Sequence, residues 1–165
     1  MKKLLIILII TTLLGCDKSD NSDNSNELIY GYNIDVSIEF SVLNSQNEDL
    51  LNPENPNHLD VKKIKLFYII DGEKKGIYNT FMDNPRNFRV YEHENEYRIG
   101  VSLNLTETSE KPITYIQWND TDTDTIEVTI KRTPHSTLSE EIWLNGMHVW
   151  ERGNNTIDPY FVLRK

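Results

Sequence analysis

Residues 34–42, IDVSIEFSV, decide the fold class of this chain. Apolar side chains occupy every second position, and Asp35, Ser37, Glu39 and Ser41 stand between them. Successive side chains of a strand point to opposite faces, so this stretch would have one apolar and one polar face. A helix would scatter the same apolar residues around its axis. The stretch therefore predicts a strand with one face in the core and the other in water.

Nine further segments have the composition and alternation of short strands, and turn signals separate them about every eight to twelve residues. No segment has the periodicity of an amphipathic helix. This pattern predicts an all-β domain, a single antiparallel β-sandwich of immunoglobulin-like or transthyretin-like topology, with a small barrel as the alternative. The nine segments are 63–70, 73–78, 88–93, 97–105, 113–118, 125–130, 142–144, 147–150 and 160–163.

The segment 141–150, EIWLNGMHVW, has an Asn-Gly pair between two apolar runs, which is the strongest short hairpin signal. A two-residue turn would pair Trp143 with His148, and Glu141 with Trp150. Trp143, His148 and Trp150 would then share the face that points away from the core. Two interpretations stay open. The tryptophans form a flat platform for a sugar ring or a partner, or another segment covers them and they brace the hairpin.

The start of the chain combines two lysines, an apolar run over 4–14, and the single cysteine, Cys16. An eleven-residue helix would span about 17 Å, well short of the roughly 30 Å hydrocarbon core of a bilayer. The run therefore describes a secretory signal peptide. The tetrapeptide Leu13-Leu14-Gly15-Cys16 resembles the lipobox of bacterial lipoproteins, in which an apolar residue, a tolerant position and a small residue precede an invariant Cys.

This resemblance implies that residues 1–15 are a lipoprotein signal peptide that is cut off, and that the Cys16 sulfur receives a diacylglycerol. Two or three acyl chains hold a protein stably on a membrane. The expected location is the cell outer membrane, with the periplasmic and the surface-exposed leaflet both open, and no cofactor other than the covalent lipid is expected. The aromatic strand, Asn-Gly turn and second aromatic strand near the end also resemble small uncharacterised cell-envelope lipoproteins of the Bacteroidota.

Residues 16–27 contain no apolar side chain after the cysteine, and such a tract cannot bury enough area to become ordered. They are expected to form a flexible tether, which leaves residues 28–165 as one domain. The chain has a net charge of −9, and removal of residues 1–15 leaves 15 basic and 26 acidic residues, a net charge of −11. Nucleic acid is not an expected partner of so acidic a protein.

Few motifs in the chain carry chemistry. Asp120, Asp122 and Asp124 alternate with threonines and form a weak candidate for Ca²⁺, but Thr125 and Lys131 stand where an EF-hand loop needs Gly and Glu. An acidic strand connection is the alternative, so no metal site is predicted. The four histidines lack zinc-ligand spacing, and no nucleophile elbow or phosphate loop occurs. No catalytic residue is predicted.

Together these features predict a lipid-anchored cell-envelope protein with a non-catalytic binding or structural role. Its partner would be a glycan, a peptide or another envelope protein. The alternatives are a small β-barrel that binds an apolar ligand and a hydrolase whose site the sequence does not reveal.

Replacement of the anchor residue tests the location. Cys16→Ser should leave the domain folded, because the residue lies outside it, and should release or mislocalise the protein, because no sulfur accepts the lipid. Membrane fractionation with detection of the unprocessed chain measures this. Unprocessed Cys16→Ser protein that still sediments with membranes would show that the apolar leader itself is the anchor.

Overall fold

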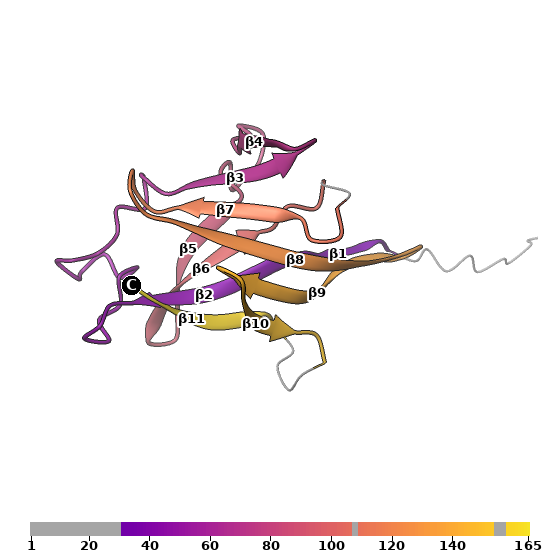
Figure 1. The fold of residues 1–165 in the computed structure, drawn as a ribbon. Coiled ribbons are helices and arrows are strands. Elements are labelled where there is room, and N and C mark those ends of the chain that lie inside the picture. Colours follow the sequence, from indigo (N-terminus) through magenta and orange to yellow (C-terminus); the bar gives the residue numbers. More distant parts are fainter. Residues whose placement is uncertain (1–30, 107–108, 154–157) are drawn as a thin grey trace, which may run out of the picture.

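The computed structural model describes residues 31–106, 109–153 and 158–165, and every regular element in these ranges is a β-strand (Figure 1). The predicted signal peptide, Cys16, the tether and the first residues of the predicted domain lie outside the described residues. Within the described ranges, no helix is long and apolar enough to cross a membrane. The strands are β1 (Asn33–Asp35), β2 (Ser37–Leu43), β3 (Lys65–Ile70), β4 (Glu73–Gly76), β5 (Phe88–His93), β6 (Glu96–Ser102), β7 (Ile113–Gln117), β8 (Thr123–Thr133), β9 (Ser136–Leu144), β10 (Met147–Glu151) and β11 (Tyr160–Arg164).

The strands form two open sheets that pack together around one apolar core, which confirms the predicted β-sandwich. The larger sheet has seven strands in the order β1-β9-β8-β7-β3-β4, with β10 also paired to β9, and the smaller has the order β11-β2-β6-β5. The pairings are antiparallel as predicted, except that β1 runs parallel to β9 and β11 runs parallel to β2. These two pairings join strands far apart in sequence, where no short turn dictates the direction.

The predicted strand over 34–42 divides at Val36 into β1 and β2, which belong to different sheets. The buried apolar residues of this stretch are Val36, Ile38, Phe40 and Val42. The inward face of β2 is therefore as predicted, but Ile34 is 60% exposed, and its predicted place in the core is wrong. Figure 1 shows the cause, since β1 lies along the part of the β8–β9 hairpin that extends beyond the smaller sheet.

The core joins the two sheets through an aromatic cluster around Phe40. Its ring stacks on Phe161 of β11 with 4.7 Å between centroids, and it meets the Trp118 ring edge-on at 6.0 Å. Phe40 comes from the smaller sheet and Trp118 follows β7 of the larger one, so this contact connects the layers. Leu50 and Leu51, from the loop after β2, are also buried and belong to the same core.

The β8–β9 hairpin is longer than the predicted strands 125–130 and 142–144. Residues 131–139, KRTPHSTLS, show no apolar alternation, so nothing in their pattern indicated a strand. Apart from the turn at 134–135, they are extended because β8 and β9 pair with each other as far as Thr133 and Ser136, and β9 pairs with β1 on its other side. Their strand structure thus follows from backbone pairing, and the side chains buried within them, Thr137 and Ser139, are polar.

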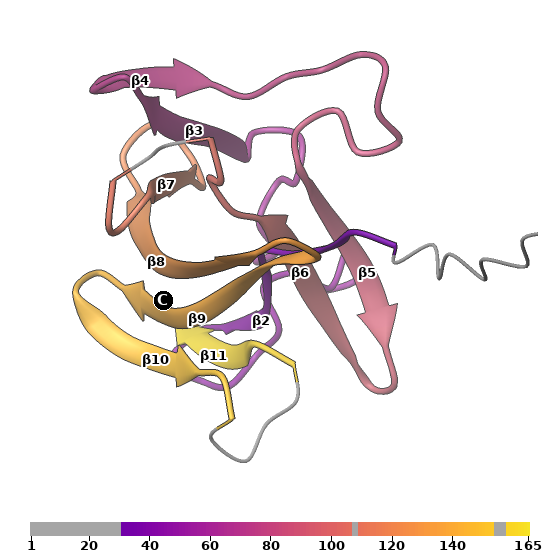
Figure 2. The same ribbon diagram turned by 90° about the vertical axis from the view of Figure 1, so that its right-hand side faces the viewer.

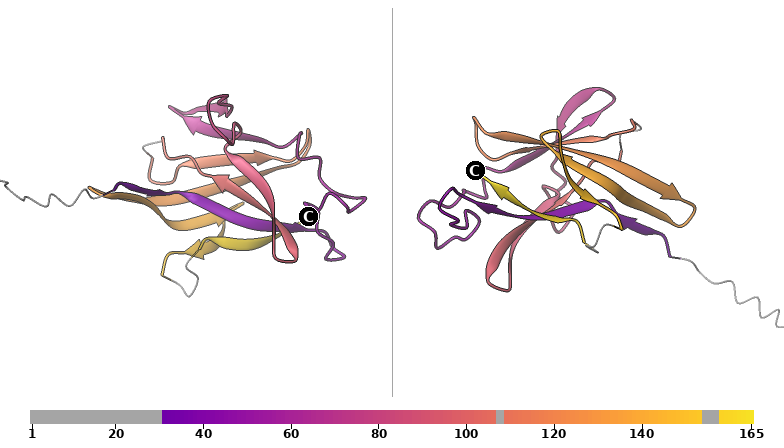
Figure 3. Two further views of the ribbon diagram at one scale, coloured as in Figure 1. Left: turned by 180° about the vertical axis from the view of Figure 1, so that it is seen from behind. Right: turned by 60° about the horizontal axis from the view of Figure 1, so that its bottom comes forward.

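A buried carboxylate, Asp124, ties the end of the chain to the sandwich. Its Oδ2 accepts hydrogen bonds from Trp118 Nε1 and Lys165 Nζ, both at 2.7 Å, and its Oδ1 accepts one from Asn145 Nδ2 at 2.7 Å. The Lys165 backbone N–H also donates to the carbonyl oxygen of Leu43 at 2.9 Å, so the chain end lies beside β2 (Figure 3). Burial by itself would raise the pKa of Asp124, but the hydrogen bonds from Asn145, Lys165 and Trp118 hold that pKa below its ordinary value.

Replacement of Asp124 tests this connection. Asp124→Asn should lower the free energy of unfolding at pH 7 by about 2 kcal/mol, because the buried Trp118 indole N–H loses a charged acceptor and the partly buried Lys165 ammonium loses one of its two carboxylates. Because the pKa of Asp124 is lower in the folded than in the unfolded state, its carboxylate stabilises the fold at pH values above the unfolded pKa. The difference in unfolding free energy between Asp124→Asn and the wild type should therefore shrink as the pH falls below about 4. Urea denaturation followed by tryptophan fluorescence at several pH values measures both effects.

The neighbouring Asp122 provides the control for this measurement. It also contacts Lys165 Nζ, at 2.8 Å, but its side chain is 37% exposed. Asp122→Asn should therefore change the free energy of unfolding by less than about 1 kcal/mol. Equal effects of the two replacements would contradict the central role of Asp124.

Candidate functional site

The C-terminal hairpin does not form the predicted platform. The observed register pairs Met147 with Leu144 and His148 with Trp143, as predicted, but it shifts between His148 and Trp150. Trp150 consequently lies opposite Ile142 instead of Glu141, and its side chain turns into the core, where it is 4% exposed. A β-bulge of this kind inserts one residue and reverses the facing of every later side chain. The prediction that both tryptophans share an outer face is wrong for this reason.

Trp143 keeps its predicted outer face, but its ring is already occupied. The Lys111 ammonium lies 3.5 Å from the ring centroid, and the His148 ring lies at 5.3 Å. His148 Nε2 is in turn 3.3 Å from a Glu141 carboxylate oxygen. A ligand that stacked on Trp143 would have to displace the lysine, so this face is not an open platform.

The three aspartates proposed as a weak calcium site are not gathered around a free space. Lys165 Nζ lies between Asp122 and Asp124 at 2.8 and 2.7 Å, where a cation would have to sit. Asp120 is exposed in the turn after β7. In the part of the chain that the structure describes, no group of three or more His, Cys, Asp or Glu side chains could hold a metal ion.

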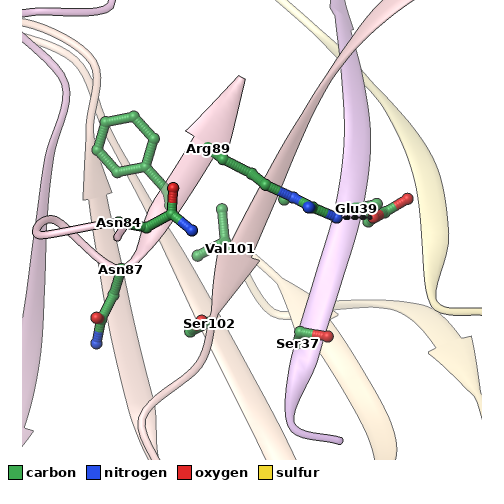
Figure 4. A pocket seen from close by; sticks show the side chains of 9 residues that line it. Ser37, Glu39, Asn84, Asn87, Arg89, Val101 and Ser102 are labelled. Carbon is green, nitrogen blue, oxygen red and sulfur yellow. Dashed lines mark ion pairs between the residues drawn. The ribbon is translucent and has the colours of Figure 1, made fainter. Parts of the chain in front are cut away.

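A pocket of about 260 Å³ lies on the outer face of the smaller sheet (Figure 4). Gly100 of β6 forms its floor, with Glu39 of β2 paired to it on one side and Arg89 of β5 on the other. Because Gly100 has no side chain, the Arg89 and Glu39 side chains reach toward each other across it, with 3.7 Å between Nη2 and Oε1. The pocket is lined by Ser37, Glu39, Asn84, Asn87, Phe88, Arg89, Gly100, Val101 and Ser102.

A network of charged and aromatic side chains supports one side of this pocket. Arg98 reaches Glu39 at 3.9 Å and donates to Glu96 at 2.6 Å, and its guanidinium lies 4.1 Å from the Tyr160 ring centroid. Glu96 also accepts hydrogen bonds from Ser41 at 2.9 Å and from the Tyr160 hydroxyl at 3.3 Å. Burial raises the pKa of Glu96, but the hydrogen bonds from Arg98, Ser41 and Tyr160 outweigh it and lower that pKa overall. Glu96 thus stays charged and holds Arg98 in place.

Tyr91 of β5 stands beside the pocket with the Arg89 guanidinium 4.7 Å from its ring centroid. Burial raises the pKa of the Tyr91 hydroxyl, and the nearby Glu39 carboxylate raises it further, to about 12. Arg89 and Arg98 act in the opposite direction and only partly offset these effects. The hydroxyl therefore remains a neutral hydrogen-bond donor at physiological pH.

The sequence alone does not distinguish these outward residues. It predicts strands over 88–93 and 97–105, but alternation identifies their inward faces only. One signal was present, because an isolated glycine inside an alternating strand, Gly100, indicates a close approach of another group. That signal could locate the floor of the pocket, but not Arg89 or Glu39, which are brought beside it only by strand pairing.

Comparison of the chain with protein-family models, with curated proteins and with solved structures finds no match in any of the three. Its function is therefore inferred from its own geometry.

Titration of Tyr91 tests the electrostatics of the pocket. The wild-type pKa should lie near 12. Glu39→Gln should lower it while leaving it above its ordinary value of about 10, because the carboxylate is lost but burial remains. Carbon NMR of labelled tyrosine measures this, and Glu127→Gln on the other sheet serves as the control. A wild-type Tyr91 that titrates near 10 would contradict the combined effect of burial and the Glu39 carboxylate.

Proposed function

We propose that this chain is a lipid-anchored, non-catalytic binding protein of the bacterial cell outer membrane, and that the pocket over Gly100 recognises a glycan. The lipobox-like leader supports the anchor and the location. The polar residues between the leader and the domain would give the domain reach from the membrane. The polar lining of the pocket supports a glycan as the ligand.

The observation that carries this proposal is the mixed polar lining around Gly100. A guanidinium from Arg89, a carboxylate from Glu39 and the hydroxyls of Ser37 and Ser102 surround one small pocket. A sugar hydroxyl both donates and accepts hydrogen bonds, so it is satisfied by donors and acceptors placed together. An anionic ligand would meet the Glu39 carboxylate, and an apolar ligand would leave these groups without partners.

Two further features suit sugar binding. The Arg89–Glu39 pair is long, at 3.7 Å, and the Arg89 side chain is 60% exposed, so both groups can turn to a ligand at little cost. The neutral Tyr91 hydroxyl beside the pocket can donate a hydrogen bond to a sugar hydroxyl or accept one from it.

The lining favours binding over hydrolysis. Glycoside hydrolysis ordinarily requires two carboxyl groups on opposite sides of the bond that is cut. Glu39 is the only carboxylate among the residues that line this pocket. The nearby Glu96 is engaged by Arg98, Ser41 and Tyr160. A role in recognition is therefore the better fit.

Filling the pocket provides the test. The Cβ added by Gly100→Val would lie 3.6 Å from Arg89 Nε, an ordinary contact, so the strand should remain intact while the pocket closes. Screening the full-length protein against an array of envelope and plant polysaccharide fragments should identify a ligand, and calorimetry should show at least about tenfold weaker binding by Gly100→Val.

Gly76→Val serves as the matched control, because it adds the same side chain to a strand of the other sheet, where its Cβ would lie 3.6 Å from the Phe67 ring. It should bind the glycan as the wild type does. The proposal fails if no glycan on the array binds at millimolar concentration, or if Gly100→Val binds as tightly as the wild type.

A further inference from the structure

The seven-stranded sheet ends in an open edge at β4. β4 is the last strand in the sheet order, and within the described ranges only β3 pairs with it (Figures 1 and 2). All four of its residues are exposed. The loop after β4 leaves toward β5 and does not run back along this edge (Figure 2).

The backbone groups that face outward on β4 follow from its pairing. The Ile77 N–H donates to the Leu66 carbonyl oxygen at 2.9 Å, and in an antiparallel pair such bonded positions alternate with non-bonded ones. Lys75 and Glu73 therefore bond inward to β3, while Lys74 and Gly76 present an N–H and a C=O to the outside. An added strand would find both a donor and an acceptor at each of these two residues.

A groove of about 390 Å³ lies where β4 ends. Its apolar lining comes from Ile64, Leu66, Phe67, Ile77 and Tyr78, and Gly76 borders it. Because Gly76 has no side chain, the edge of the Phe67 ring stays accessible from the groove. An apolar side chain of an added strand would fit here, and it would bury area next to the backbone bonds.

This edge carries positive charge on an acidic protein. Between Lys62 and Arg86 the chain has six basic and three acidic residues, although its net charge is −9. Lys62 and Lys65 line the groove, and among the described residues neither has an ion pair within 4 Å. Lys74 lies over the Phe67 and Tyr115 rings, at 4.5 and 4.6 Å from their centroids. The charge complement of this edge is an anionic segment.

We propose that the β4 edge binds an extended acidic peptide segment of a partner protein by strand addition. An apolar side chain of that segment would enter the groove, and its carboxylates would face Lys62, Lys65 and Lys74. A second copy of this chain is a poorer occupant, since antiparallel pairing of two β4 strands through their outward residues would place Lys74 opposite Lys74 or Lys75 opposite Lys75 in the two registers of greatest overlap. The edge belongs to the other sheet from the Gly100 pocket, so the two binding activities can fail separately.

Fluorescence anisotropy with a defined probe tests the proposal. The purified full-length protein in detergent is titrated against a labelled nine-residue peptide that alternates Glu with Val, and against the same peptide with Lys in place of Glu. The acidic peptide should bind at least about tenfold more tightly than the basic one. Equal binding of the two peptides, or no binding of either, would overturn the proposal.

Two replacements of Gly76 separate strand addition from charge attraction alone. Gly76→Pro removes the outward N–H but none of the bonds from residues 75 and 77 to β3, as proline on an edge strand allows. Gly76→Ala keeps that N–H, and its Cβ would lie in ordinary contact with Phe67. Gly76→Pro should weaken acidic-peptide binding about tenfold, whereas Gly76→Ala should bind within about twofold of the wild type.

A further variant keeps the test decisive if Gly76→Pro does not fold. Lys62→Glu combined with Lys65→Glu leaves the β4 backbone untouched and should reverse the preference from the acidic to the basic peptide. An unchanged preference would overturn the proposal, as would equal binding by a folded Gly76→Pro protein and the wild type. A dimer in sedimentation velocity that Gly76→Pro abolishes would assign the edge to a second copy instead.

Discussion

The carboxylate of Asp124 holds together three parts of the chain that are distant in sequence. It binds the indole of Trp118 after β7, the turn residue Asn145 of the β9–β10 hairpin, and the ammonium of Lys165 at the chain end. Such a group is stable in a buried place only because all its donors are present, since a buried charge without partners is strongly destabilising. The sandwich therefore depends on long-range polar contacts at this point as well as on its apolar core.

The smaller sheet also depends on contacts between segments that are far apart in the chain. Its edge strand β11 comes from the end of the domain and pairs with β2 from the start, so the sheet is complete only when both ends are in place. β11 brings Tyr160, whose hydroxyl donates to Glu96 and whose ring lies under Arg98. Arg98 in turn lies next to Glu39 at the pocket. The side chains around the pocket are thus positioned by the same closure of the chain that Asp124 and Lys165 secure.

The two proposed binding surfaces use different properties of a sheet. The pocket over Gly100 lies on a sheet face, where side chains of neighbouring strands meet and a missing side chain leaves a space. The β4 edge presents backbone groups, and its specificity would come from the lysines and the groove beside it. We therefore propose a glycan for the first surface and an extended peptide for the second, because the outward N–H and C=O groups of Lys74 and Gly76 can pair with an added strand.

The sequence by itself determined the all-β class, the approximate place of most strands and the Asn-Gly turn, because side-chain alternation and turn chemistry are local properties. The tertiary structure alone decided which sheet each strand joins, that residues 131–133 and 136–139 are extended, and that a bulge turns Trp150 inward. It also decided that the Lys165 ammonium forms ion pairs with Asp122 and Asp124, and that the Arg89 and Glu39 side chains meet over Gly100. The physical reason is that backbone pairing and charge pairing join residues far apart in the chain, and a local sequence pattern does not identify the distant residue with which a given residue pairs.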